Sequence, residues 1–112
     1  SRGLGDVYKR QVLYGGRAVA FEAKSTKKSR IQRSALTDTQ MEWLREQKKF
    51  GALTFVAVNI QEKFYTVPFD LWDNMKLFYD KKFLMHDDIA DYEVIYDGSV
   101  RFLEFENGGK II

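Results

Sequence analysis

The sequence has no cysteine and a single proline among its 112 residues. Without cysteine the chain forms no disulfide and offers no thiolate to a metal ion. This fits a reducing compartment, so we expect a cytoplasmic protein. No apolar run approaches the ~20 residues of a transmembrane helix, so we expect no membrane association. The sequence does have material for a core, because 45% of its residues are hydrophobic and 15% are aromatic. One folded domain is therefore the expectation.

The first eleven residues, SRGLGDVYKRQ, do not resemble a natural start. They have no initiator Met, and DVYKRQ is what GAT-GTG-TAT-AAG-AGA-CAG encodes, a string that resembles a transposon mosaic-end adapter. We therefore predict that residues 1–11 are an adapter-derived artefact and that the natural domain begins at residue 12. A real, polar N-terminus is the alternative.

The charge of the remaining residues is divided unevenly. Residues 12–50 hold nine Lys and Arg against four Asp and Glu, a balance of +5, and residues 51–112 hold six against eleven, a balance of −5. A basic half can attract a polyanion although the two halves together are neutral. A solvated surface of mixed charge explains the same numbers equally well.

The sequence VLYGGRAVAFEAK predicts a β-hairpin, because two β-prone runs surround a Gly-Gly pair. Alternation in the second strand places Val19, Phe21 and Ala23 on one face, which we expect to be core. The opposite face carries Glu22 and Lys24 after two alanines. The small methyl groups leave space beside the two charges.

A helix is expected to begin after Thr37, because Thr37-x-x-Gln40 is a capping-box pattern. Leu36 can staple onto Met41, and Gly51 suits the end of the helix. The apolar side of this helix is predicted to hold Met41, Trp43, Leu44 and Phe50. The run ALTFVAVNI is nearly all apolar, as in a strand buried on both faces, and FYTV predicts a short strand after it.

A second helix is expected over residues 70–79, with Leu71, Met75 and Phe78 in register. The other segments are predicted to be a polar loop at 25–34, a loop with one helical turn at 80–92, and a final hairpin at 93–106. This order of elements predicts an α/β domain with a mixed β-sheet.

The pair Glu22-x-Lys24 sets a carboxylate and an ammonium side by side on one face of a stiff strand. A hard divalent cation such as Mg²⁺ takes oxygen ligands, commonly one or two carboxylates with substrate phosphate and water. A fixed ammonium can stabilise negative charge that grows on phosphate oxygens. The tripeptide alone is more typical of a surface ion pair worth about 0–1 kcal/mol. The apolar approach AVAF and the basic loop that follows favour a phosphate site.

The stretch GGRAVAFEAKSTKKSR, followed by LTDTQMEWL, resembles the active-site core of RecU-type Holliday-junction resolvases, within the PD-(D/E)xK nuclease superfamily. The matching features are the Gly-Arg pair, the FEAK run with the threonine behind it, and Gln40 in the first turn of the next helix. The resemblance covers most of residues 12–92. It implies a restriction-endonuclease-like fold, in which helices flank a mixed β-sheet.

The resemblance also implies roles for individual residues. Glu22 would be a ligand of Mg²⁺, with Mn²⁺ as the alternative cofactor, and Lys24 would stabilise the transition state. The family's metal-site glutamine falls on Gln40, which also completes the capping box. The family further implies a homodimer that nicks two strands of a four-way DNA junction symmetrically, in recombination and repair.

One family ligand has no counterpart in this sequence. The family carries another acidic metal ligand in a Thr-x-Asp pattern one strand upstream. The family spacing, counted back from Glu22, puts Lys9 at the aspartate and Val7 at the threonine. Both lie in the predicted artefact, and Asp6 is not a credible substitute. We therefore expect residues 12–112 to be a partial nuclease domain whose parent cuts DNA, whereas this chain does not.

Five further basic residues are candidates for contact with DNA phosphates: Arg17, Lys27, Lys28, Arg30 and Arg33. Phosphate contacts give affinity and salt dependence without sequence choice, which suits an enzyme that recognises the shape of a junction. A solvated loop is the alternative. His86 is not predicted to bind a metal. The aspartates around it are explained by the preference for acidic residues at the start of a helix, and the sequence has no second histidine.

The sequence therefore predicts an endodeoxyribonuclease, specifically a RecU-like Holliday-junction resolvase. Two alternatives stay open. One is another repair or restriction-type nuclease of the same superfamily, and the other is a non-catalytic DNA-binding module on the same scaffold. Cleavage of junctions compared with linear duplexes would separate the two nucleases, and the upstream gene sequence would separate the binding module from both.

Overall fold

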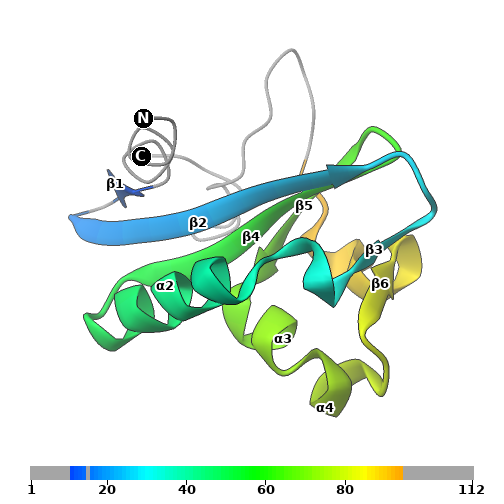
Figure 1. Cartoon of the computed structure of the whole chain (residues 1–112). Coiled ribbons are helices and arrows are strands. Elements are labelled where there is room, and N and C mark those ends of the chain that lie inside the picture. Colours follow the sequence, from blue (N-terminus) through cyan, green and yellow to red (C-terminus); the bar gives the residue numbers. More distant parts are fainter. Residues whose placement is uncertain (1–10, 15, 95–112) are drawn as a thin grey trace.

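A mixed four-stranded sheet forms the centre of the fold (Figure 1). The structure is a computed structural model, and it describes residues 11–14 and 16–94. In sheet order the strands are β1 (Gln11–Tyr14), β2 (Arg17–Thr26), β4 (Leu53–Ile60) and β5 (Lys63–Pro68). Strand β2 runs parallel to β4, and β1 and β5 run antiparallel to their neighbours. The predicted α/β fold with a mixed sheet is confirmed.

Helix α2 (Asp38–Lys49) begins where the sequence predicts. The Oγ1 atom of Thr37 accepts a hydrogen bond from the Gln40 N–H at 3.1 Å. The Gln40 Oε1 in turn accepts from the Thr37 N–H at 3.0 Å, which completes the capping box. Leu36 and Met41 are both buried, as a hydrophobic staple requires.

The end of α2 depends on a backbone conformation that favours glycine. Gly51 has a φ of +92°, and its N–H donates to the carbonyl of Lys48, while the Ala52 N–H donates to the carbonyl of Gln47. These two bonds form a Schellman motif. Phe50 is 80% exposed. Its predicted place on the apolar side of the helix is wrong, because it is the cap residue beyond the last helical turn.

The second predicted helix is in fact two short helices, α3 (Phe69–Asp73) and α4 (Met75–Tyr79). Asn74 between them has φ −103° and ψ 35°, which interrupts the helical backbone. The fully buried residues of these helices are Phe69, Trp72 and Met75. The predicted register is wrong at Phe78, which is exposed, because the break at Asn74 shifts the buried face.

A second, two-stranded sheet stands where the sequence predicts loops. Strand β3 (Arg30–Gln32) pairs antiparallel with β6 (Phe83–Met85). The short 3₁₀ helices η1 (Arg33–Ala35) and η2 (His86–Tyr92) follow these strands. Strands of three residues are too short to show an alternating pattern, and the two partners come from opposite halves of the chain, so sequence periodicity does not reveal them.

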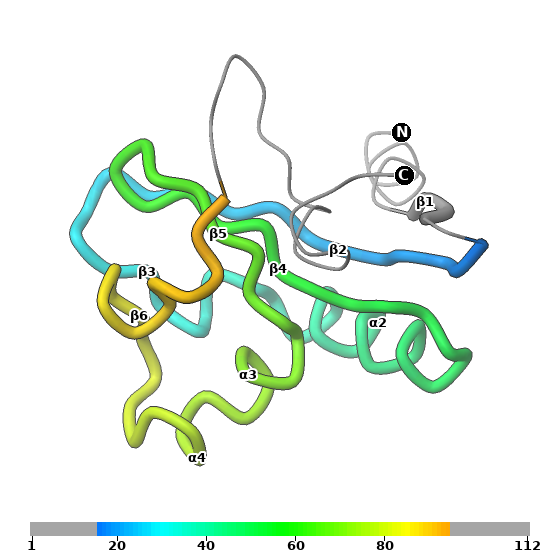
Figure 2. Tube along the Cα trace, turned by 180° about the vertical axis from the view of Figure 1, so that it is seen from behind, coloured from blue at the N-terminus to red at the C-terminus, as the bar shows by residue number. Residues whose placement is uncertain are grey.

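Helices α2, α3 and α4 cover one face of the main sheet, and the β3–β6 sheet stands beside them (Figures 1 and 2). The larger apolar cluster lies under these helices and includes Ala20 of β2 together with Leu44 and Trp72. A smaller cluster on β2 and β4 contains Val19 and Phe55.

The prediction that the Val19 face of β2 is core is confirmed at Val19, which is fully buried in the smaller cluster, but this face does not hold the main core. The main core lies under the opposite face, which also carries Glu22, because α2 and α3 pack there. Ala23 is exposed. Phe21 belongs to the smaller cluster, where its ring stacks on that of Phe55 with centroids 4.9 Å apart. The charged pair of β2 thus faces the helices.

Most of the predicted final hairpin lies outside the described residues. Of that segment, Glu93 forms an isolated antiparallel bridge with Tyr65 of β5. Among the helices of the described residues, none is long and apolar enough to cross a membrane.

Candidate functional site

Glu22 is a nearly buried carboxylate in the middle of β2. The residue is 6% exposed, and its backbone lies beside Val56 of β4. A carboxylate at this depth needs hydrogen bonds or opposite charge, because desolvation disfavours its ionised form. The pairing of β2 with β4 from Val19 to Thr26 fixes the strand that carries it.

Gln40 reaches Glu22 from the first turn of α2. Its Nε2 donates a hydrogen bond to Glu22 Oε1 at 3.3 Å, while its own Oε1 accepts from the Thr37 N–H. One amide therefore caps the helix with its oxygen and contacts the carboxylate with its nitrogen. The capping role predicted for Gln40 is confirmed. In this orientation Gln40 presents its NH₂ group, not its oxygen, to Glu22.

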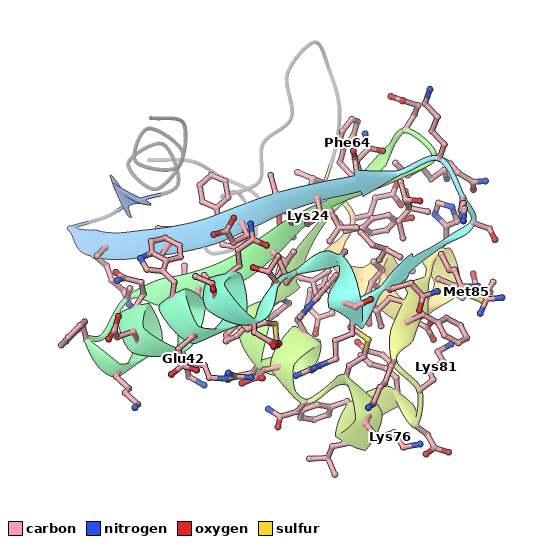
Figure 3. All side chains as sticks on the ribbon, in the orientation of Figure 1. Lys24, Glu42, Phe64, Lys76, Lys81 and Met85 are labelled. Atoms are coloured by element: carbon pink, nitrogen blue, oxygen red, sulfur yellow. The ribbon has the colours of Figure 1, made fainter. Side chains whose placement is uncertain are left out.

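Lys24 lies two residues beyond Glu22 on the same face of β2, and its backbone pairs with Val58 of β4. The side chain is half-buried, and Figure 3 shows it on β2, well away from Lys76 on α4. Among the described residues Lys24 forms no ion pair. On one face, β2 thus carries the buried carboxylate and a half-buried ammonium that has no ion pair among the described residues.

The other basic candidates divide by their contacts. Lys27 and Lys28 are exposed in the turn after β2. Arg17, at the other end of β2, donates through Nε to the carbonyl of Gly51 at 3.1 Å. The Arg30 guanidinium lies 4.2 Å from the centre of the Phe83 ring in a cation–π contact. These four residues do not form one cluster, because Arg17 sits at the far end of the strand.

Arg33 is held within the protein by α3. Its Nη2 pairs with Asp73 Oδ1 at 3.2 Å and also donates to the Asp73 carbonyl at 2.9 Å, and its Nε donates to the Trp72 carbonyl. Arg45 of α2 donates two hydrogen bonds to the same carboxylate. Its Nε donates to Oδ2 at 3.1 Å, and its Nη2 donates to Oδ1 at 2.8 Å. One carboxylate therefore joins η1, α2 and α3.

The sequence gives no sign of this role for Asp73. Its partners lie 28 and 40 residues away, and neither separation matches a helical or strand period. The hydrogen bond from Arg45, together with the positive charges of Arg45 and Arg33, lowers the pKa of the Asp73 carboxyl although burial opposes that shift. The pKa of Arg45 is raised for the same reason. Asp73 is thus held ionised between two arginines.

Replacing Asp73 by asparagine is expected to lower the free energy of unfolding by about 1–3 kcal/mol, since charge-assisted bonds are lost. Because the folded-state pKa of Asp73 is lowered, this stabilisation is fully present above the unfolded pKa of roughly 3.9 and fades as the pH falls below it. Urea unfolding at pH 7 and pH 3 measures the difference. The matched control is Asp70→Asn, whose partner Lys48 is more exposed and which should change little. An equal effect of Asp73→Asn at both pH values would contradict the ion-pair explanation.

His86 is engaged by two neighbours. Its Nδ1 lies 2.5 Å from the hydroxyl of Tyr65, and its Nε2 lies 2.9 Å from Oε1 of Gln61. Burial raises the pKa of Tyr65, with the charges of Glu93 and Asp87 adding to the shift. The histidine therefore joins η2 to β5 and to the turn before it, which is a structural arrangement.

A metal ion at this site would find one buried carboxylate. Glu22 offers the oxygen atoms that a hard divalent cation prefers. Within residues 16–94 no group of three His, Cys, Asp or Glu side chains gathers to hold a metal. The residues described thus fit part of a divalent-cation site and do not complete one.

A family model described as "RecU: Recombination protein U" matches residues 11–107. A comparison with curated proteins found no match. The family match covers β2, which carries Glu22, and α2, which carries Gln40, together with the rest of the sheet. The chain therefore belongs to the recombination protein U family, a family of Holliday-junction resolvases.

Proposed function

We propose that this chain is part of the catalytic domain of a Mg²⁺-dependent, structure-selective DNA endonuclease that resolves Holliday junctions in recombination and repair. The observation that carries the proposal is the 3.3 Å contact between the Gln40 amide and the Glu22 carboxylate. It joins two positions of the family's motif that are 18 residues apart in the sequence. A buried carboxylate held by an amide at a strand–helix junction suits a cation site better than a surface ion pair.

Glu22 is the residue that would hold Mg²⁺ or Mn²⁺. Gln40 donates to one carboxylate oxygen and so fixes the orientation of that group, as partners beyond the ligands of a metal site commonly do. Its own oxygen is turned toward Thr37, so we assign Gln40 to the positioning of Glu22. A bound cation would supply positive charge to phosphate oxygens and lower the pKa of a water.

Lys24 would act on the phosphate itself. Its ammonium sits on the same face of β2 as the Glu22 carboxylate, and the strand holds the spacing between their backbones. Negative charge that develops on the phosphate oxygens during attack is stabilised by a cation already in place. The absence of an ion pair for Lys24 among the described residues supports this role, because its charge is available to a substrate.

Lys27 and Lys28 would contact the DNA backbone beyond the scissile phosphate. They follow Lys24 along the chain and are exposed. Arg17 on β2 and Arg30 on β3 are also exposed, and we include them in the proposed surface. Arg33 contributes by shaping this region, since Asp73 already holds its guanidinium.

We further propose that the chain as given binds DNA without cutting it, and that the active form is a homodimer. Lys9 stands where the family has its second acidic ligand, and a cation held by Glu22 alone is bound weakly. Two active sites in a dimer would nick two strands of a four-way junction symmetrically.

The test uses a protein that supplies the missing ligand. Either Val7→Thr with Lys9→Asp, or exchange of residues 1–11 for the corresponding strand of another family member, gives what we call the acid-restored protein. With Mg²⁺ it is expected to cut four-way junctions, and Glu22→Gln should reduce cutting by roughly 100-fold or more. Glu46→Gln on the exposed side of α2 is the matched control. Cutting that survives Glu22→Gln contradicts the proposal.

The same assay distinguishes the other interpretations. Equal cutting of linear duplex and junction would point to a repair or restriction-type nuclease. Junction binding without cutting by the acid-restored protein would point to a binding module.

A further inference from the structure

A pocket of about 540 Å³ lies beside the start of α2, outside the Glu22 site. Its apolar floor is formed by Leu36 and Met41, which are buried. Its polar rim carries the exposed side chains of Gln32, Ser34 and Lys82. An amide, a hydroxyl and an ammonium around one opening are donors suited to an oxyanion.

The fold brings this rim together from two distant parts of the chain. Gln32 and Ser34 belong to β3 and η1, whereas Lys82 directly precedes β6. The Arg33 N–H donates to the Lys82 carbonyl at 2.8 Å, and Gln32 pairs with Phe83. Lys82 comes from the acidic half of the sequence, so its place beside the basic loop is visible only in the folded chain.

Lys82 differs from the neighbouring lysines in its ion pairing. Lys81 pairs with Asp88 at 2.7 Å, and Lys76 pairs with Asp80 at 3.6 Å. Among the described residues Lys82 forms no ion pair. Asp38 is the acidic residue of the pocket lining, and it too has no ion pair within the described part of the chain.

Hydrogen bonds of the capping box link the wall of the pocket to the proposed catalytic site. Thr37 lines the pocket, and both of its capping bonds run to Gln40, whose amide contacts Glu22. A phosphodiester chain that passes Glu22 and Lys24 would meet the pocket on the other side of this box.

We propose that the pocket binds a backbone phosphate of the DNA, with Lys82 as its cationic ligand and the Ser34 hydroxyl and Gln32 amide as donors. The proposal rests on the proposed function, and it extends the DNA surface from the β2–β3 loop to the chain before β6. The rim offers hydrogen-bond donors but little that would recognise a base, so the contact would not depend on DNA sequence.

The test measures binding of the chain as given to a fluorescent four-way junction, by anisotropy at several NaCl concentrations. Lys82→Ala is expected to weaken binding about three- to tenfold and to reduce the slope of log affinity against log salt by about 1, as for one lost phosphate contact. Lys76→Ala is the matched control, because that lysine sits on α4 with Asp80 as its partner, and it should leave both quantities unchanged.

A second variant of the same pocket is expected to change DNA affinity in the opposite direction. Asp38→Asn removes the carboxylate from the lining, so it should tighten binding two- to fivefold if a phosphate enters, and this gain should vanish when Lys82→Ala is added. Circular dichroism confirms the fold of each variant.

The outcomes separate the pocket from the proposed function. If Lys27→Ala with Lys28→Ala weakens binding while Lys82→Ala and Asp38→Asn do not change it, the pocket is overturned and the proposed function stands. If Lys82→Ala weakens binding no more than Lys76→Ala does, the pocket is likewise overturned. No DNA binding by the unaltered chain would contradict the proposed function as well.

Discussion

In the acid-restored protein, Lys24→Ala is expected to reduce junction cleavage by about 100- to 1000-fold while junction binding changes less than threefold. That loss of rate is the usual effect of removing one fixed group that stabilises developing charge. Binding should survive because Lys27 and Lys28 remain exposed to the DNA backbone. Single-turnover cleavage and anisotropy on the same junction give the two quantities.

The position of Lys24 makes this separation of rate and affinity plausible. Lys24 is half-buried, and its backbone is fixed by the pairing of β2 with β4 on the same face as Glu22. Lys28→Ala is the matched control, since it removes one exposed positive charge from the adjoining turn. It should lower affinity and the salt slope but leave the single-turnover rate within about threefold at saturating protein. Unchanged cleavage by Lys24→Ala would refute the role assigned to Lys24.

What the sequence predicts well is what depends on neighbouring residues. The capping box at Thr37 and Gln40 is local, since each partner is three residues from the other, and the structure has it as predicted. The Gly-Gly hairpin and the nearly all-apolar β4 are local for the same reason. Each of these signals comes from turn chemistry or hydrophobic period within one element.

What the sequence does not predict depends on how elements pack. The alternation of β2 separates its two faces correctly, but it does not predict which face the helices will cover. In the structure α2 and α3 pack on the face that carries Ala20 and Glu22. That choice is what buries Glu22 to 6% exposure and brings Gln40 within hydrogen-bonding distance. The resemblance to the family selected both residues, whereas the contact between them needed the fold.

The ion pairing of the basic residues also depends on how the elements pack. Arg33 and Lys82 have opposite settings in the sequence, one inside a basic run and one in an acidic half. In the structure Asp73 holds Arg33, whereas Lys82 has no ion pair among the described residues. Counting charges along the chain cannot detect this difference, because it depends on the packing of η1 against α3 and on the pairing of β3 with β6.

Replacing Gln40 is expected to separate the capping function of its amide from the positioning of Glu22. In the acid-restored protein, Gln40→Ala should weaken Mn²⁺ affinity about 10- to 100-fold, because an orienting partner of the ligand is lost. Its stability should fall by about 1 kcal/mol, because the capping box is also lost. Isothermal titration and thermal unfolding measure the two effects on the same sample.

Thr37→Ala provides the matched control, because it removes the same capping box from the other side. It should cost about 0.5–2 kcal/mol of stability, yet leave Mn²⁺ affinity within about threefold, since the Gln40 amide still lies beside Glu22. Gln40→Glu completes the comparison. It preserves the capping pattern but replaces the donor by a second carboxylate, which repels Glu22 without metal and becomes a possible ligand with it. Its unfolding temperature should therefore rise more steeply with Mn²⁺ than that of the unaltered protein. If Thr37→Ala lowered the Mn²⁺ affinity as much as Gln40→Ala does, loss of the helix cap alone would explain the effect of both substitutions. The contact with Glu22 would then have no role in positioning the carboxylate.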